Sequence, residues 1–228
     1  MTLLISLTRF NNKWTLFFFW LFFTNVNGSD EICDLSVNPC SIDGCDKLVK
    51  MNVSLPIRQE TKTGYDRYYF LRDTGGHWGD RGMDCRDTRA EVLEATSLVP
   101  VVFSKSACVV KLGLWYDPYS DSTFEFAHDL DIDHFIPLKE AYESGADKWS
   151  AAERSDFANE YLKSANLIPV WSSLNRSKGA REPHEWLPPN IEYACDYLSR
   201  WAYIKWFSGL SVDKNECGFI KARLTECH

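Results

Sequence analysis

The stretch Asp129-Leu-Asp-Ile-Asp-His-Phe-Ile-Pro-Leu138 decides the fold of this chain. Its apolar residues alternate with polar ones, as in a half-buried β-strand, and Pro137 is expected to end the hydrogen-bonded ladder. Because successive side chains of a strand point to opposite faces, we expect Asp131 and Asp133 to share one face and His134 to lie on the other. Such a strand end suits metal-assisted hydrolysis, since carboxylates bind hard divalent cations and a neutral imidazole can take a proton from water. The alternative for these residues alone is an edge strand with solvated acids.

The first 28 residues have the pattern of a secretory signal peptide. Arg9 and Lys13 precede an apolar run from Trp14 to Phe23, and Val26-Asn-Gly28 offers small residues for cleavage. The run is too short to span a bilayer comfortably, because a spanning helix needs roughly 20 apolar residues. We therefore expect a secreted or periplasmic mature protein with no stable membrane association after cleavage. An uncleaved N-terminal anchor is the alternative.

The charge of the chain limits its possible partners. It carries 25 basic and 32 acidic side chains, and removal of residues 1–28 leaves 23 basic ones and a net charge near −9. Non-specific affinity for nucleic acid comes from neutralising phosphates, so an acidic protein binds it poorly overall. Any contact with nucleic acid must therefore be local.

All eight cysteines follow residue 28, and an even number behind a secretory signal predicts disulfides. Cys85 and Cys108 are a local pair, and a link from Cys195 to Cys217 or Cys227 would fix the C-terminus. Three cysteines precede residue 50, and at least one of them needs a distant partner. The sequence leaves the full connectivity open.

The order of the expected elements indicates an α+β protein with a signal peptide (1–28), a cysteine-containing extension (29–64) and a main domain (65–228). Residues 30–60 are expected to be irregular. The aromatic and basic residues of 65–70 either pack in the core or stack on a nucleic-acid strand. Thr88 and Glu91 form a capping box, which predicts a helix start at Thr88. Further along we expect a hairpin (99–103 with 108–116), a turn (117–120), helices from 139 and 150, a strand (165–171), a short helix (172–179), a core helix (191–206) and a short C-terminal helix or loop.

Folding the strand and short helix of 165–179 back onto the first strand places Asn175 opposite Asp133, with His134 and Asn166 nearby. The core motif, Asn166-Leu, Asn175-Arg-Ser-Lys-Gly179 and Glu185-Trp-Leu-Pro-Pro189 occur in one order that resembles the HNH endonuclease superfamily. The resemblance is to secreted members with an Asp-x-Asp-His-x-x-Pro-Leu motif and covers about Tyr65 to Cys227, whereas residues 29–64 match nothing comparable. It implies a ββα-metal core with added helices and a β-hairpin, stapled by disulfides.

The resemblance also implies roles for individual residues. His134 would be the general base that deprotonates the attacking water, and Asn166 would orient it or, alternatively, cap the strand end. Asp133 and Asn175 would hold one divalent cation on the scissile phosphate and the departing 3′-oxygen. Asp131 ranks below Asp133 as a further ligand or a support for the ligands. Oxygen ligands favour Mg²⁺, with Mn²⁺ or another divalent ion as alternatives.

Arg176, Lys178 and Arg181 form a basic patch beside Asn175 in an otherwise acidic protein. We expect them to contact phosphates, with a merely solvated helix end as the alternative. The sequence thus predicts a secreted metal-dependent endonuclease acting on DNA, or also RNA, with little sequence specificity because no segment resembles a reading helix. A non-catalytic secreted binding module on a retained ββα scaffold is the alternative. A carboxylate-pair glycosidase fits the histidine and the basic helix poorly.

Overall fold

The structure is a computed structural model that describes residues 9–10, 13–14, 31–37, 51–71, 76–159 and 165–227. Most of the predicted signal peptide lies outside the described residues. Of that segment only β1 (Arg9–Phe10) and β2 (Lys13–Trp14) are described, as an antiparallel pair. Every helix in the described ranges is too short or too polar to cross a membrane.

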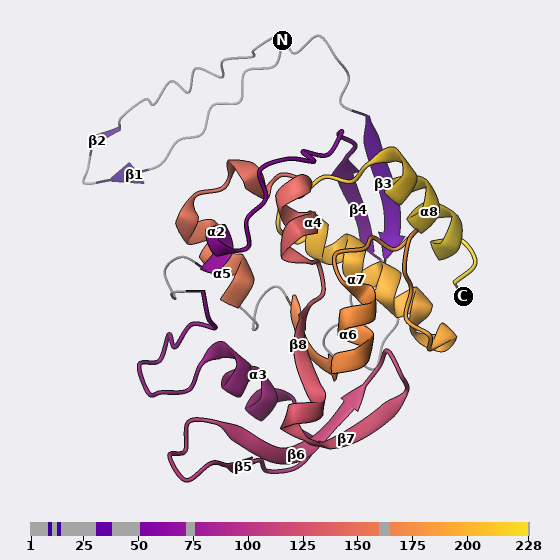
Figure 1. Ribbon diagram of the computed structural model, residues 1–228. Coiled ribbons are helices and arrows are strands. Elements are labelled where there is room, and N and C mark those ends of the chain that lie inside the picture. Colours follow the sequence, from indigo (N-terminus) through magenta and orange to yellow (C-terminus); the bar gives the residue numbers. More distant parts are fainter. Residues whose placement is uncertain are drawn as a thin grey trace.

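The remaining elements form small sheets with helices packed around them (Figure 1). The strands are β3 (Ile32–Val37), β4 (Met51–Pro56), β5 (Val102–Phe103), β6 (Val110–Asp117), β7 (Ser122–Phe126), β8 (Leu130–His134) and β9 (Leu167–Trp171). The α-helices are α2 (Tyr68–Leu71), α3 (Thr88–Thr96), α4 (Leu138–Glu143), α5 (Ala151–Asn159), α6 (Ser172–Lys178), α7 (Ala194–Phe207) and α8 (Lys214–Leu224). Short 3₁₀ turns occupy Ala127–Asp129, Ala146–Lys148 and Ile191–Tyr193. The chain is thus of mixed α+β class, as the sequence predicted.

Two antiparallel strands and the helix that follows them carry the predicted motif. β8 pairs with β9, so that Asp131 lies opposite Val170 and His134 opposite Leu167. α6 begins directly after β9 and packs against both strands (Figure 1). β8 ends at His134, earlier than the alternating pattern suggests, because Phe135 and Ile136 turn into the core before α4 begins.

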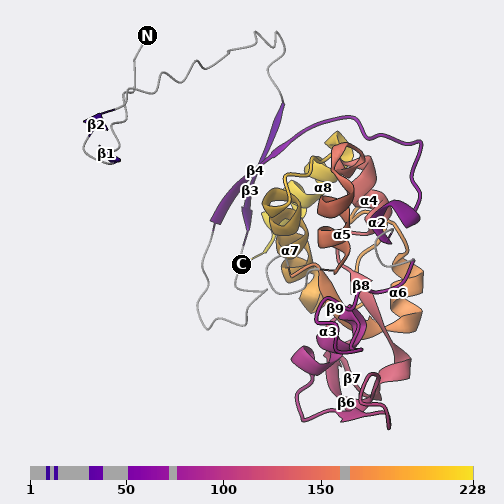
Figure 2. The same cartoon turned by 90° about the vertical axis from the view of Figure 1, so that its left-hand side faces the viewer.

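The extension is a two-stranded sheet, and the prediction that residues 30–60 are irregular is wrong for the part that the structure describes. β3 and β4 pair antiparallel over their full lengths. Their inward side chains are at most 4% exposed and belong to the same core cluster as α7: Cys33, Leu35, Val37, Val53 and Leu55. Figure 2 shows this sheet beside α7 and α8, with the β5–β7 sheet at the opposite end of the molecule and β8 and β9 between them. The extension and the main domain therefore share one core.

Three disulfides join the described cysteines, and they agree with the pairings considered from the sequence. Cys85 bonds Cys108, and Cys195 bonds Cys227. Cys33 reaches Cys217, 184 residues along the chain, which is the expected distant partner. Cys40 and Cys45 lie outside the described residues. These links fix both β3 and the C-terminal helix to the core.

The predicted turn at 117–120 is confirmed, but it connects β6 to β7, a strand that the sequence analysis did not anticipate. The helix start at Thr88 is also correct, although the cap is a different residue. Asp87 accepts a hydrogen bond from the amide of Ala90, while the Thr88 hydroxyl donates to the carbonyl of Gly79. Thr88 therefore fixes the preceding loop instead of capping its own helix.

Candidate active site

One face of α6 packs against one face of β8, so that two residues of the helix each contact one aspartate of the strand. Asp131 and Asp133 are two residues apart on a strand, and Asn175 and Lys178 are three apart on a helix, so each pair shares a face. The Asn175 amide donates to Asp131 Oδ2 at 3.2 Å, and Lys178 Nζ donates to both oxygens of Asp133 at 2.7 and 2.9 Å. Asn175 therefore lies against Asp131, not against Asp133 as the sequence predicted.

Asp133 and Lys178 form a buried ion pair. Asp133 is 3% exposed and Lys178 is 0% exposed. The Tyr119 hydroxyl also donates to Asp133 at 2.7 Å, and Lys178 donates to the carbonyl of His134 at 2.9 Å. Burial raises the pKa of Asp133 and lowers that of Lys178, while their mutual attraction opposes both shifts.

The burial of Lys178 corrects the prediction that its side chain contacts phosphate. Its long stem runs beneath α6, where the ammonium group is enclosed by Asp133 and the end of β8. A charged group is stable in the protein interior only when it is paired. If the Lys178 side chain swung out to a phosphate, the carboxylate of Asp133 would remain buried without its counter-charge. Lys178 thus supports the strand that carries His134.

His134 is held in a single orientation. Its Nε2 lies 2.9 Å from the carbonyl oxygen of Ala158, and its ring stacks on Trp78 with a centroid distance of 5.1 Å. A carbonyl only accepts hydrogen bonds, so Nε2 must carry the proton and Nδ1 has the free lone pair. Burial lowers the pKa of His134 to about 3, with Arg67 contributing further. The imidazole is therefore neutral at physiological pH.

Hydrogen bonds from Gly79 to Asn159 and from Thr88 to Gly79 hold the loop that carries Trp78. The amide of Gly79 donates to the side-chain oxygen of Asn159 at 2.9 Å, and Thr88 donates to the carbonyl of Gly79 at 3.0 Å. Asn159 ends α5, one residue after Ala158. The same helix end thus positions both the hydrogen-bond partner of His134 and the ring stacked on it.

Asn166 acts on the backbone next to His134. Its side-chain oxygen accepts from the amide of Ile136 at 2.8 Å, and its carbonyl accepts from the amide of Phe135 at 2.7 Å. This is the strand-end cap that the sequence analysis kept as an alternative. Asn166 positions His134 through the turn that follows it.

An open cavity of about 310 Å³ lies in front of these residues. It brings together Asp133, His134 and Asn175 in its wall, and Arg67 and Lys139 also line it. Arg176 is exposed, with Nε 3.6 Å from Asp131. Arg181 is exposed as well and donates to the carbonyl of Lys178. Arg67 and Lys139 therefore lie at the cavity itself, and Arg176 and Arg181 are exposed on and just after α6, next in sequence to lining residues.

Several residues of this site escaped the sequence analysis as functional candidates. Tyr119 and Asn159 lie within the range that the family resemblance covers, but no pattern in their local sequence shows that they point inward. Burial raises the pKa of Tyr119 well above its usual range, so its hydroxyl stays protonated and donates to Asp133. Arg67 belongs to the aromatic and basic run at 65–70. That run was a candidate for nucleic-acid contact, and its arginine does line the cavity.

The neutral state of His134 predicts a pH dependence of stability. Because its pKa falls from 6.5 in the unfolded chain to about 3 in the folded one, its contribution is fully present above pH 6.5 and is lost as the pH falls toward 3. By linkage this loss is at most about 4–5 kcal/mol. We expect urea unfolding in EDTA to show the stability advantage over His134→Gln shrinking across this window. An advantage that is constant between pH 7 and pH 4 would contradict a buried neutral imidazole.

The oxygen atoms at the cavity suit a hard divalent cation. The side chain of Asp131 is 32% exposed, and its Oδ2 lies against the amide of Asn175. Rotation of that amide by half a turn would present its oxygen instead of its nitrogen. Both oxygens of Asp133, in contrast, already accept from Lys178. Asp133 and Asn175 line the cavity, and Asp131 lies against Asn175 outside the lining. The residues present therefore fit such a cation, with Asp131 the more exposed carboxylate and Asp133 the one in the cavity wall.

Comparison with known proteins places the chain in a family. Residues 89–216 match the family described as GmrSD restriction endonucleases, C-terminal domain, and this range contains β8, β9 and α6. An "Uncharacterized secreted protein" of Arthroderma benhamiae (strain ATCC MYA-4681 / CBS 112371) is 35% identical over 158 residues, which is 69% of this chain and 76% of the relative. No solved structure matches the chain. The chain belongs to the family of the C-terminal domain of GmrSD restriction endonucleases.

Proposed function

We propose that this protein is a secreted, metal-dependent endonuclease that hydrolyses phosphodiester bonds of DNA, and also of RNA, with little sequence specificity. The observation that carries the proposal is His134, a neutral imidazole with one nitrogen fixed on a carbonyl, in the wall of an open cavity. The family of restriction endonucleases supports nuclease chemistry, and the name of the fungal relative supports secretion. In this proposal the antiparallel pair β8 and β9, followed by α6, serves as the ββα core expected for an HNH nuclease.

His134 is the general base in this proposal. Its Nδ1 accepts a proton from the attacking water, and the imidazolium that forms keeps its Nε2–H bond to Ala158. Trp78 and Asn166 hold the ring and the turn beside it, so little reorganisation is needed when the proton moves. Protonation in the ground state would disable the base, and burial prevents it.

Asn175 and Asp131 would hold the divalent cation, and Asp133 is the alternative carboxylate. The cation supplies charge neutralisation at the scissile phosphate and the leaving oxygen. The exposure of Asp131, its contact with Asn175 and the use of both Asp133 oxygens by Lys178 support this choice, whereas the place of Asp133 in the cavity wall supports the alternative. Asp133, with Lys178 and Tyr119, keeps the end of β8 rigid.

The substrate is a polyanion in this proposal because of where the positive charges lie. Arg67 and Lys139 line the cavity, and Arg176 and Arg181 are exposed beside it. Side chains from three segments can neutralise successive phosphates of one strand. Tyr65 also lines the cavity and offers a ring on which a base can stack. Such contacts carry no sequence information, which accounts for the expected lack of specificity.

Plasmid cleavage by the oxidised mature protein tests the proposal. We expect cleavage with Mg²⁺ or Mn²⁺ and none in EDTA. Asp131→Asn and Asn175→Ala should each lower the rate roughly 100-fold and raise the Mg²⁺ concentration needed, since even supports of metal ligands contribute 10–100-fold. Asp129→Asn is the matched control, because the side chain of Asp129 is 42% exposed and contacts only His128 among the ion pairs described.

The outcomes separate the possible assignments. An Asp131→Asn variant with the Mg²⁺ dependence of the wild type would transfer the ligand role to Asp133. Folded protein that cleaves neither DNA nor RNA with any cation would remove the proposal. The binding-module alternative would then account better for the retained scaffold.

A further inference from the structure

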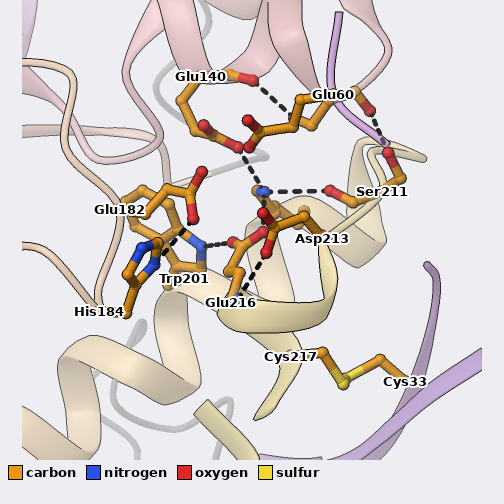
Figure 3. A network of polar contacts seen from close by, with 12 residues as sticks. Cys33, Glu60, Glu140, Glu182, His184, Trp201, Ser211, Asp213, Glu216 and Cys217 are labelled. Atoms are coloured by element: carbon orange, nitrogen blue, oxygen red, sulfur yellow. Dashed lines mark hydrogen bonds and ion pairs between the residues drawn. A yellow bond between two sulfur atoms is a disulfide. The ribbon is translucent and has the colours of Figure 1, made fainter. Parts of the chain in front are cut away.

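Five carboxylates gather where the extension meets the C-terminal helices (Figure 3). None of them lines the proposed catalytic cavity. They come from four different parts of the chain: Glu60 after β4, Glu140 on α4, Glu182 after α6, and Asp213 and Glu216 at the start of α8. We call this group the acidic junction. Three of its side chains, those of Glu60, Glu140 and Glu216, are at most 3% exposed.

Two of the five carboxylates share one lysine as their counter-charge. Lys205 Nζ donates to Glu140 at 2.6 Å, to Glu216 at 2.7 Å and to the carbonyl of Ser211 at 3.0 Å (Figure 3). The Trp201 indole also donates to Glu216. Burial by itself lowers the pKa of Lys205, but the two carboxylates outweigh it and raise that pKa. Lys205 is thus a permanent cation with its three donors used.

The other three carboxylates, those of Glu60, Glu182 and Asp213, face one another. One oxygen of each lies within 4.8 Å of the other two. Oxygens around a Ca²⁺ ion, with bonds of about 2.3–2.6 Å, are at most about 5 Å apart, so the three can share one ion. The spacing of the three carboxylate oxygens therefore matches that of oxygens bound to one Ca²⁺ ion.

Two of these carboxylates have oxygens without a hydrogen bond. Glu60 is 3% exposed at its side chain, and its Oε1 has no hydrogen-bond partner among the described residues. Glu182 is 7% exposed at its side chain, and His184 Nδ1 approaches its Oε2 at 3.0 Å outside hydrogen-bond geometry. Lys62 contacts the other oxygen of Glu60, but its side chain is 69% exposed. A buried carboxylate oxygen without a hydrogen-bond partner is costly, and a cation between the three carboxylates would coordinate both oxygens.

The three facing carboxylates also bring like charges close together. A cation among them would remove this repulsion. A proton on Glu182 is the competing way to relieve it, and the experiment below distinguishes the two.

The backbone holds Glu60 and Asp213 side by side, and a cavity connects them to solvent. Ile57 and Val212 form a parallel bridge, with the amide of Arg58 donating to the carbonyl of Val212 at 2.9 Å. This bridge sets Glu60 beside Asp213. A cavity of about 420 Å³ is lined by both of these residues and opens to solvent. A hydrated ion can therefore reach the site in the folded protein.

We propose that Glu60, Glu182 and Asp213 bind a divalent cation, with Ca²⁺ as the ion that fits best. All three ligands are carboxylates, which Ca²⁺ accepts in irregular geometry, with water completing its six to eight ligands. The bound ion joins the extension to the loop after α6 and to the start of α8. Glu60 lies outside the segment that matches the family, so the extension supplies a ligand that the matched segment lacks. The site is structural and does not depend on the proposed hydrolysis.

Thermal unfolding of the full oxidised protein, stripped with EDTA and titrated with CaCl₂ at constant ionic strength, tests the site. We expect a saturable rise in Tm of about 5 °C or more. Terbium alone is a second probe, and its luminescence on tryptophan excitation should appear because Trp201 contacts Glu216 in the same cluster. Both measurements are made in wild type and in Asp131→Asn, which removes the proposed catalytic ligand.

Glu182→Gln and Asp213→Asn should lose the Tm shift and most of the luminescence, and Asp213→Asn can still cap α8. Asp131→Asn and His134→Ala should keep both, so failure here is distinguishable from failure of the nuclease proposal. Absence of any calcium-dependent shift, with Glu182→Gln as stable as wild type, would overturn the proposal in favour of a proton. A calcium-dependent rise in Tm that is as large in Glu182→Gln and Asp213→Asn as in wild type would also overturn the proposal.

Discussion

Replacing His134 with alanine is expected to reduce metal-dependent plasmid cleavage by about 10²–10⁴-fold, the usual contribution of a positioned general base. The structure gives the reason. Nε2 is committed to the carbonyl of Ala158, so Nδ1 is the ring nitrogen available to a water in the cavity. Burial keeps that nitrogen unprotonated down to acidic pH. Single-turnover cleavage at saturating Mg²⁺ would measure the loss without interference from product release.

This substitution also has a cost in stability, which the assay must separate from the loss of the base. The ring of His134 is buried and stacked on Trp78, so alanine leaves a space in the wall of the cavity. Circular dichroism should therefore establish that the variant is folded at the assay temperature. His128→Ala is the matched control, because the side chain of His128 is 78% exposed, and it should cleave like wild type. A folded His134→Ala protein with more than a tenth of the wild-type rate would exclude the proposed mechanism.

Replacing Lys178 with methionine should lower the free energy of unfolding by about 3–5 kcal/mol, because it leaves the carboxylate of Asp133 buried without its counter-charge. Methionine keeps most of the volume of the side chain, so the effect reports the charge and not a cavity. Urea denaturation at pH 7.5 would measure it as a lower midpoint with an unchanged slope. If Lys178 were instead a surface lysine that contacts phosphate, the Lys178→Met variant would be as stable as wild type and would bind substrate more weakly.

Two further variants make this test specific. Arg176→Met lies on the same helix with its side chain 75% exposed, and it should change stability by less than about 0.5 kcal/mol. Adding Asp133→Asn to Lys178→Met removes the uncompensated charge, and part of the lost stability should return. If the double variant were less stable than Lys178→Met alone, the ion pair would not be the source of the loss.

Local patterns in the sequence were sufficient to predict the order of the elements around the site. The helix expected from residue 150 is α5, and Ser150 and Glu153 form a capping box at its start, with the amide of Ser150 donating to Glu153 at 2.7 Å. The strand, strand and helix that carry the motif also occur in the predicted order, because period-two alternation and helix signals depend only on neighbours in the chain. Strand β3 carries the same alternation at Cys33, Leu35 and Val37, but the density of cysteine and proline in this segment favoured an irregular structure.

The pairing across the site could not be obtained in this way. Whether Asn175 meets Asp131 or Asp133 depends on how α6 is rotated about its axis and how far it slides along β8. Those two quantities are set by packing of the whole core. The same applies to Lys178, whose side chain looks like a surface residue until the helix is placed over the strand. Trp78 and Tyr119 reach the site from loops, where no periodicity indicates a direction.

The bond between Cys33 and Cys217 has a consequence for the producing cell. The bond joins residues 184 apart in the sequence. It can form only after α8 has been synthesised and the chain has entered an oxidising compartment, so β3 is not covalently linked to α8 before then. In the chain-entropy model a loop of this length contributes about 5 kcal/mol to stability. A reduced chain in the cytosol would lack that contribution. With the proposed nuclease activity and export, the protein would thus reach full stability only outside the cytosol, and this delay would protect the nucleic acid of the producing cell.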